Sequence, residues 1–178
     1  MVLTANWRNE IQERWGIHVL GEHSLLGSEA LWVTRCSKTK NGVYCGTPKE
    51  LYASSVNRYF YGHMEKRGWR YGVLSDKYGL HLDNEKLSCY DVHPSELSRQ
   101  DRQRLGRLIR DKVLAQGFDR VIFYSPSPLM SIPYFEMLYY SGLNLFYATS
   151  LNFLEGDPHH PLRQSLPGDP DQQAPAVR

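Results

Sequence analysis

Short apolar runs alternate along the chain with longer segments in which apolar residues recur at helical spacing. Each run is bounded by polar residues or glycine, which is typical of a buried strand. The predicted strands are residues 17–20, 31–34, 71–75, 121–125 and 144–150. The intervening segments predict helices over residues 6–15, 48–68, 95–116 and 131–140.

Strands that alternate with helices predict an α/β fold with a mostly parallel sheet of four to five strands and helices on both faces. The chain of 178 residues is long enough for one domain, which we expect over residues 1–156. Residues 157–178 are rich in Pro, Gly, Asp and Gln. That composition offers little to bury and predicts a disordered tail.

In parallel sheets, ligands bind in crevices outside the carboxyl ends of the strands. Three segments with reactive or polar side chains lie at the ends of predicted strands: residues 36–40, 75–79 and 125–128. We therefore expect Cys36, Lys77 and Ser125 to line one cleft.

Composition narrows the class of protein only modestly. A net charge of +2 does not by itself indicate nucleic-acid binding. Three cysteines without a disulfide rhythm favour a reducing compartment. No stretch has the apolar length of a membrane span, and residues 1–10 lack the apolar core of a signal peptide. A cytoplasmic protein without membrane contact is expected.

Cys36 is the candidate nucleophile. Arg35, Lys38 and Lys40 are its neighbours in sequence, and nearby cations favour a thiolate. The alternative is a half-buried structural cysteine at a strand end. Lys77 directly follows a strand, where a lysine is costly unless it is paired or used. Asp91 is a candidate for proton transfer or for an anion at a helix start.

The residues admit two further interpretations. Zinc would need ligands from the cysteines and from His63 and His81, but no Cys-x-x-Cys or His-x-x-x-His spacing is present. We expect no metal and no other cofactor. The longest helix carries arginines opposite its apolar face, which form a solvated surface or meet phosphates. They are Arg99, Arg104, Arg107 and Arg110.

The order of the motifs resembles the YaaA-like superfamily, which includes the core domain of archaeosine synthase. The resemblance is carried by Cys-Ser-Lys-Thr-Lys at 36–40, Leu-Tyr-x-Ser-Ser at 51–55, Leu-Ser-x-Lys-Tyr-Gly-Leu at 74–80, and Tyr90-Asp91. Cys36 and Lys40 match the Cys-x-x-x-Lys spacing of archaeosine synthase. Arg35, Asn41 and Gly42 depart from its pattern. In size the chain is more similar to the DpdC family of bacterial 7-deazaguanine DNA-modification clusters.

The DpdC resemblance implies an enzyme that converts the nitrile of 7-cyano-7-deazaguanine in DNA to the amide, in the manner of a nitrile hydratase. Its implied partners are DNA carrying 7-deazaguanine bases and other proteins of a DNA-modification cluster. Cys36 would be the nucleophile, Lys38 or Lys40 its electrostatic activator, and Lys77 or Asp91 the proton donor. The implied substrate-binding residues are Ser37, Tyr52, Ser54, Ser55, Ser75, Tyr78, Gly79, Tyr90, Ser125 and Ser127.

Two other functions stay open on the sequence. A YaaA-like protein could bind DNA without catalysis, through its lysines and the arginine face of the long helix. A base-exchange or glycosylase-like enzyme would need a carboxylate nucleophile, for which Asp76 and Asp91 are the candidates.

Overall fold

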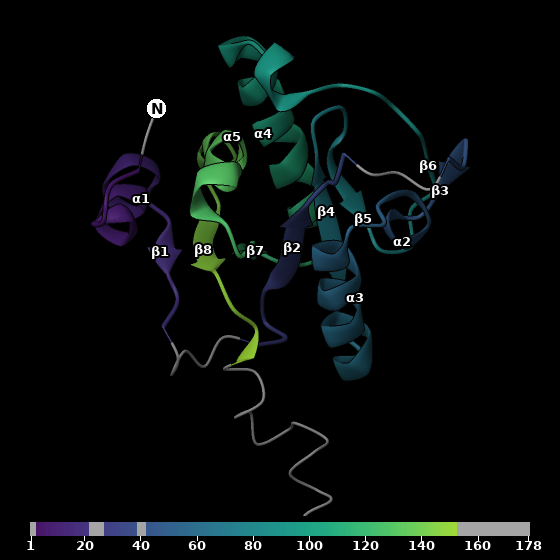
Figure 1. Ribbon diagram of the computed structural model, residues 1–178, viewed down its shortest axis with the longest axis horizontal. Helices are drawn as coiled ribbons and strands as arrows, with labels where there is room; N and C mark the ends of the chain where they lie inside the picture. The colour runs from purple at the N-terminus through teal and green to yellow at the C-terminus, as the bar shows by residue number, and fades with distance from the viewer. Residues whose placement is uncertain (1–2, 22–26, 39–41, 153–178) are drawn as a thin grey trace, which may run out of the picture.

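A six-stranded, mainly parallel sheet forms the centre of the computed structural model, which describes residues 3–21, 27–38 and 42–152 (Figure 1). The strand order is β1-β8-β7-β2-β4-β5. Neighbouring strands are parallel except β5, which runs antiparallel to β4. Their bounds are β1 His18–Val19, β2 Leu31–Arg35, β4 Tyr71–Ser75, β5 Gly79–Leu82, β7 Arg120–Tyr124 and β8 Asn144–Ala148.

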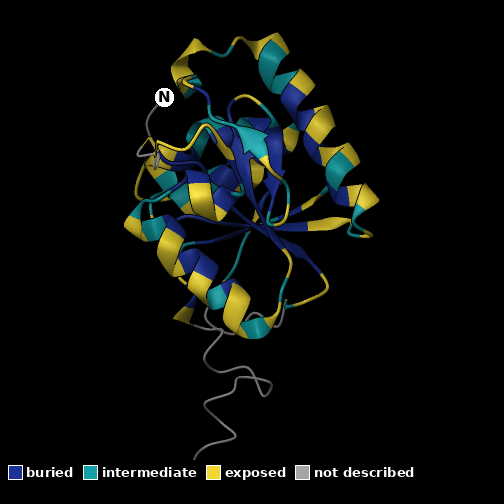
Figure 2. Cartoon of the chain, turned by 90° about the vertical axis from the view of Figure 1, so that its right-hand side faces the viewer, coloured by how far each residue is buried: buried dark blue, intermediate teal, exposed yellow. Residues whose placement is uncertain are grey.

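Helices cover both faces of this sheet. One group packs together, with contacts between α1 and α5 and between α4 and α5, and the α2–α3 pair lies apart from it. Figure 2 shows buried strands at the centre and helices whose outer sides are exposed. The helices are α1 Trp7–Trp15, α2 Pro48–Leu51, α3 Ser55–Arg67, the 3₁₀ turn Pro94–Glu96, α4 Arg99–Ala115 and α5 Pro128–Tyr139.

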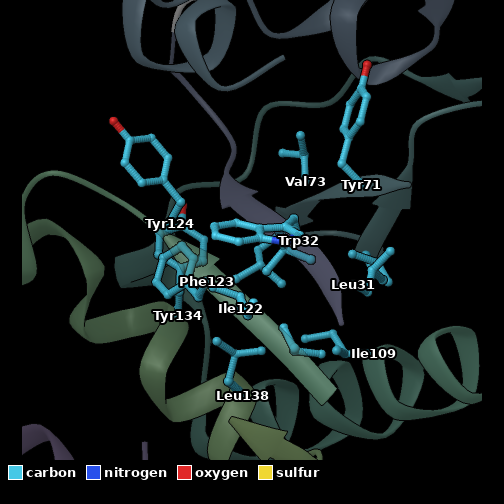
Figure 3. Packing of buried hydrophobic residues seen from close by; sticks show 14 of the residues in the cluster. Leu31, Trp32, Tyr71, Val73, Ile109, Ile122, Phe123, Tyr124, Tyr134 and Leu138 are labelled. Atoms are coloured by element: carbon cyan, nitrogen blue, oxygen red, sulfur yellow. The ribbon is translucent and has the colours of Figure 1, made fainter. Parts of the chain in front are cut away.

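Strand β7 shows how the side chains sort between the two faces, because successive residues of a strand point to opposite sides. Phe123 packs against Tyr134 and Phe135 of α5, with ring centroids 6.1 and 5.7 Å away. Tyr124 stacks on Phe60 of α3 at 5.9 Å. In Figure 3 the rings of Phe123 and Tyr134 lie together, while Tyr124 points away from them. The sheet is therefore buried on both faces, as parallel sheets are.

The predicted α/β class and single domain are confirmed. The sheet has one more strand than the upper number expected, because the antiparallel β5 was missed. The predicted helix from Pro48 is two helices: Ser54 accepts a hydrogen bond from the Asn57 backbone N–H and so starts α3 afresh. A small two-stranded ribbon, β3 Cys45–Gly46 with β6 Leu87–Ser88, was also not expected. The predicted tail at 157–178 lies outside the described residues.

Across the described ranges, no helix combines the length and the apolar character needed to cross a membrane.

Strand connectivity creates a switch point between β2 and β7. These two strands are adjacent and parallel. The chain leaves β2 toward α2 and α3, whereas it leaves β7 toward α5, on the opposite face of the sheet. Connections that depart to opposite faces leave a crevice at the carboxyl ends of the strands, which is where open α/β sheets bind ligands.

Candidate active site

A pocket of about 390 Å³ opens at this switch point. Its volume falls within the range of small-molecule sites, about 300–1,000 Å³. The end of β2, the turn after β4, the segment before α4, α4 itself and the first turns of α5 all contribute side chains. The lining residues are Arg35, Cys36, Ser37, Lys38, Asp76, Asp91, Val92, His93, Pro94, Ser95, Arg102, Leu129, Met130, Pro133 and Tyr134.

Cys36 is held in this wall by the backbone of the sheet. Its N–H donates to the Leu74 carbonyl at 2.9 Å, continuing the β2–β4 ladder by one residue. The buried Asn57 amide donates to the carbonyl of Arg35 at 2.9 Å, which fastens the end of β2 to α3. The nucleophile candidate therefore lies on rigid backbone.

The Cys36 thiol contacts one carboxylate and one phenol. Its Sγ donates to Asp76 Oδ2 at 3.2 Å and lies 3.3 Å from the Tyr134 hydroxyl. Tyr134 also donates to Asp76 Oδ2 at 3.3 Å, which closes a triangle of three groups. Cys36, Asp76 and Tyr134 are 7%, 3% and 3% exposed. A thiol, a carboxylate and a phenol thus lie within hydrogen-bond distance of one another in a buried corner of the pocket.

Burial, and after it the negative charge of Asp76, raises the pKa of the Cys36 thiol to about 11. Hydrogen bonds from Tyr134 and Tyr90 act in the opposite direction. The expectation that neighbouring cations favour the thiolate at Cys36 is therefore wrong. Arg35 and Lys38 adjoin Cys36 in sequence, but its contacts in space are Asp76 and Tyr134.

A second layer of hydroxyls lies behind the triangle. Tyr90 accepts from Ser75 Oγ at 2.8 Å and from the Tyr52 hydroxyl at 3.4 Å. The same Ser75 oxygen accepts the backbone N–H groups of Lys77 and Tyr78, which shapes the turn that presents Asp76. Burial raises the pKa of Tyr52, Tyr90 and Tyr134. These phenols stay protonated and able to donate at neutral pH.

Several sequence-predicted residues meet at the site. Cys36, Ser37, Lys38 and Asp91 line the pocket. Tyr52, Ser75 and Tyr90 form the layer behind it. Lys40 lies outside the described residues.

Other predicted residues lie elsewhere. The expected cleft shared by Cys36, Lys77 and Ser125 is wrong for the last two, since neither lines this pocket. Lys77 is exposed, with its ammonium 5.3 Å from the centroid of the Tyr78 ring. Ser125 is fully buried, and its hydroxyl bonds the Ser127 carbonyl at 3.4 Å. Ser127 precedes α5 as its N-cap residue.

Four more predicted binding residues do not line this pocket. Ser54 caps α3, and Ser55 is exposed on its first turn. The Tyr78 hydroxyl donates to the Ser88 carbonyl at 3.2 Å. Gly79 has a φ of +73°, and a Cβ there would lie 2.9 Å from the carbonyl oxygen of Leu105. Because Gly79 has no side chain, the turn can pack tightly on α4.

Sequence reasoning missed the partners of Cys36. From the sequence, Asp76 is a candidate only for the nucleophile of a base-exchange or glycosylase-like enzyme. Its position directly after β4 could also have indicated that it lies at the ligand-binding edge of the sheet. Tyr134 lies inside an apolar helical segment, where nothing local distinguishes it from a core residue. Arg102, which also lines the pocket, was not singled out either.

Within the described ranges, no group of three or more His, Cys, Asp or Glu side chains is arranged to hold a metal ion. Comparisons of the chain with models of protein families, with curated proteins and with solved structures gave no match.

Proposed function

We propose that this protein hydrates a nitrile to an amide by covalent catalysis at Cys36, and that its substrate is the 7-cyano-7-deazaguanine base in DNA. The contact between Cys36 Sγ and Asp76 Oδ2 in the wall of the pocket carries the chemical part of this proposal. The identity of the base rests on the motif resemblance around Cys36, Ser75 and Tyr90.

Addition to a nitrile needs a nucleophile and a proton for the nitrogen. The pair at rest is a thiol hydrogen-bonded to a carboxylate, because the pKa of Cys36 is raised. As Sγ bonds to the nitrile carbon, Asp76 takes the thiol proton and delivers it to the nitrogen. The product is a neutral thioimidate beside an ionised Asp76, so the net charge of the buried corner is the same before and after the step.

Hydrolysis of the thioimidate uses the same carboxylate. Asp76 takes a proton from an attacking water and passes it to the nitrogen, which gives a tetrahedral carbon bearing an amino group, a hydroxyl and the sulfur. The hydroxyl proton then moves through Asp76 to the sulfur as the C–S bond breaks. The amide leaves and the Cys36 thiol is restored, so that one water is consumed overall.

Tyr134 has a positioning role in both steps. Its hydroxyl contacts both Sγ and Asp76 Oδ2. It thereby keeps the thiol and the carboxylate within proton-transfer distance.

The test follows conversion of an oligonucleotide containing 7-cyano-7-deazaguanine by mass analysis of the released nucleosides. Cys36→Ala and Asp76→Asn should each lower turnover by about a hundredfold or more, with binding of the oligonucleotide changed only a few-fold. Cys45→Ala is the matched control, because Cys45 is exposed on β3 and remote from the pocket lining. Intact-protein mass should show an adduct of one substrate mass on Cys36.

Retention of more than about a tenth of the activity by Cys36→Ala would refute covalent catalysis at this residue. If the wild-type protein bound the oligonucleotide but never converted it, the protein would be a DNA-binding module.

A further inference from the structure

Arg35 is a half-buried cation in the pocket with no protein partner among the described residues. It lines the pocket beside Cys36, and its Nε is buried without a hydrogen bond. Burial raises the pKa of Tyr134, and the positive charge of Arg35 acts on it in the opposite direction. A guanidinium partly removed from water without a carboxylate is costly, unless a ligand supplies the anion.

Two more cations line the same pocket. Lys38 is exposed and forms no ion pair with any described residue. Arg102 reaches in from α4: one of its terminal nitrogens meets Glu136 at 3.3 Å and the other donates to the Pro94 carbonyl at 3.3 Å. These contacts hold the Arg102 side chain in place at the pocket wall.

The hydrogen-bond partners of the thiol are Asp76 and Tyr134, and none of these cations is among them. The pKa of Cys36 is set by burial, by Asp76 and by the hydroxyls of Tyr134 and Tyr90. The pocket therefore contains positive charge that the chemistry at Sγ does not require.

Two carboxylates also line the pocket. Asp76 is engaged with Cys36 and Tyr134, and Asp91 is an exposed residue of the lining.

We infer that Arg35, with Lys38 and Arg102, forms a subsite for the phosphate of a nucleotide whose base lies against Cys36. Guanidinium groups match the geometry of phosphate oxygens, and partial burial strengthens the ion pair. Leu129, Met130 and Pro133 give the pocket an apolar wall that suits a flat ring. The pocket volume of about 390 Å³ suits one nucleotide unit rather than a paired duplex.

This inference deepens the proposed function, on which it rests for the identity of the base. The phosphate contact itself is measurable without turnover. Calorimetric titration of the full chain with guanosine 5′-monophosphate, guanosine, inorganic phosphate and acetate separates the contributions of phosphate, ring and carboxylate. The variants are Arg35→Gln and, as matched control, Arg107→Gln, since Arg107 is an exposed arginine of α4 that does not line the pocket.

The wild-type protein should bind the nucleotide about tenfold or more tightly than the nucleoside, and Arg35→Gln should remove most of that difference. Arg107→Gln should leave it unchanged. Phosphate, but not acetate, should slow alkylation of Cys36 in the wild-type protein, which gives a second readout if Arg35→Gln fails to fold.

Equal affinity for nucleotide and nucleoside would overturn the subsite, and so would an equal loss in both variants. Acetate acting as well as phosphate would also overturn it in favour of a carboxylate site, and absence of nucleotide binding at millimolar concentration would leave no subsite. Nucleotide binding that depends on Arg35 without nitrile conversion would instead remove the proposed function and keep the subsite.

Discussion

At the scale of single residues, the site depends on where one proton resides. Cys36 and Asp76 lie 40 positions apart in sequence but 3.2 Å apart in space. The charge of Asp76 and the hydroxyl of Tyr134 act on the pKa of the thiol in opposite directions. Substituting each in turn should therefore shift the reactivity of Cys36 in opposite directions.

Asp76→Asn should make Cys36 more reactive toward iodoacetamide at about pH 8.5, because removing a neighbouring negative charge lowers the pKa of the thiol and raises the thiolate fraction. Tyr134→Phe should make it less reactive, because a hydrogen bond that favours the thiolate is lost. The rate is followed by intact mass in a background in which Cys45 and Cys89 are serine. Slower alkylation of Asp76→Asn than of the parent would show that the carboxylate does not act on this thiol.

At the scale of elements, the pocket depends on how α4 and α5 meet, because α4 carries Arg102 and α5 carries Tyr134. Gly106 lies in the middle of α4 and is buried. A Cβ at this position would lie 2.7 Å from the carbonyl oxygen of Met137 and 2.7 Å from Tyr140 Cβ. The two helices approach closely because this residue has no side chain.

Gly106→Ala should lower the free energy of unfolding by about 1–3 kcal/mol, because the added methyl meets backbone that must move. Its matched control is Gly62→Ala on α3, where an added Cβ meets nothing within 4 Å. That control should be stabilised by about 0.5–1 kcal/mol, as a glycine in a helix interior is replaced. Denaturant titration measures both, and an unchanged Gly106→Ala protein would mean that α4 and α5 can separate without cost.

Local sequence predicted the elements well and their partners poorly. The five parallel strands follow from apolar runs, and the mark is clearest in β2, β4 and β7, which are almost entirely buried. Strand β5 is only four residues long, Gly79–Leu82, and directly follows a tight turn. So short a segment shows no clear periodicity, and β5 was therefore not predicted. Cys36 was found because strand ends in parallel sheets bear ligands. Its pairing with Asp76 and Tyr134 is set by the strand order, which no local pattern contains.

At the scale of the whole molecule, phenols are distributed throughout the core. Burial raises the pKa of seven tyrosines. The pKa of Tyr124, for example, is raised to about 12. The seven are Tyr52, Tyr61, Tyr71, Tyr90, Tyr124, Tyr134 and Tyr147. The folded chain holds these protons and that of Cys36 at a pH where the unfolded chain releases them.

From about pH 7 up to the unfolded pKa values, 9.0 for cysteine and 10.0 for tyrosine, these groups should leave the stability unchanged, and above those values they should lower it. The slope is about 1.4 kcal/mol per pH unit for each proton that only the unfolded state releases. Denaturant midpoints between about pH 7 and 11 measure it. Tyr124→Phe should reduce the slope by about one proton, and a midpoint that stayed level to pH 11 would show that the tyrosines ionise within the fold.

The raised pKa of Cys36 has a further consequence for the lifetime of the protein under oxidation. Peroxides attack thiolates, and a thiol with a pKa of about 11 is ionised in about one molecule in ten thousand at pH 7. The Cys36 thiol is thus shielded from sulfenic and sulfinic acid formation by its own proton. In the proposed mechanism, Cys36 reacts when a bound nitrile accepts that proton through Asp76, which would confine its reactivity to the time that a substrate occupies the pocket.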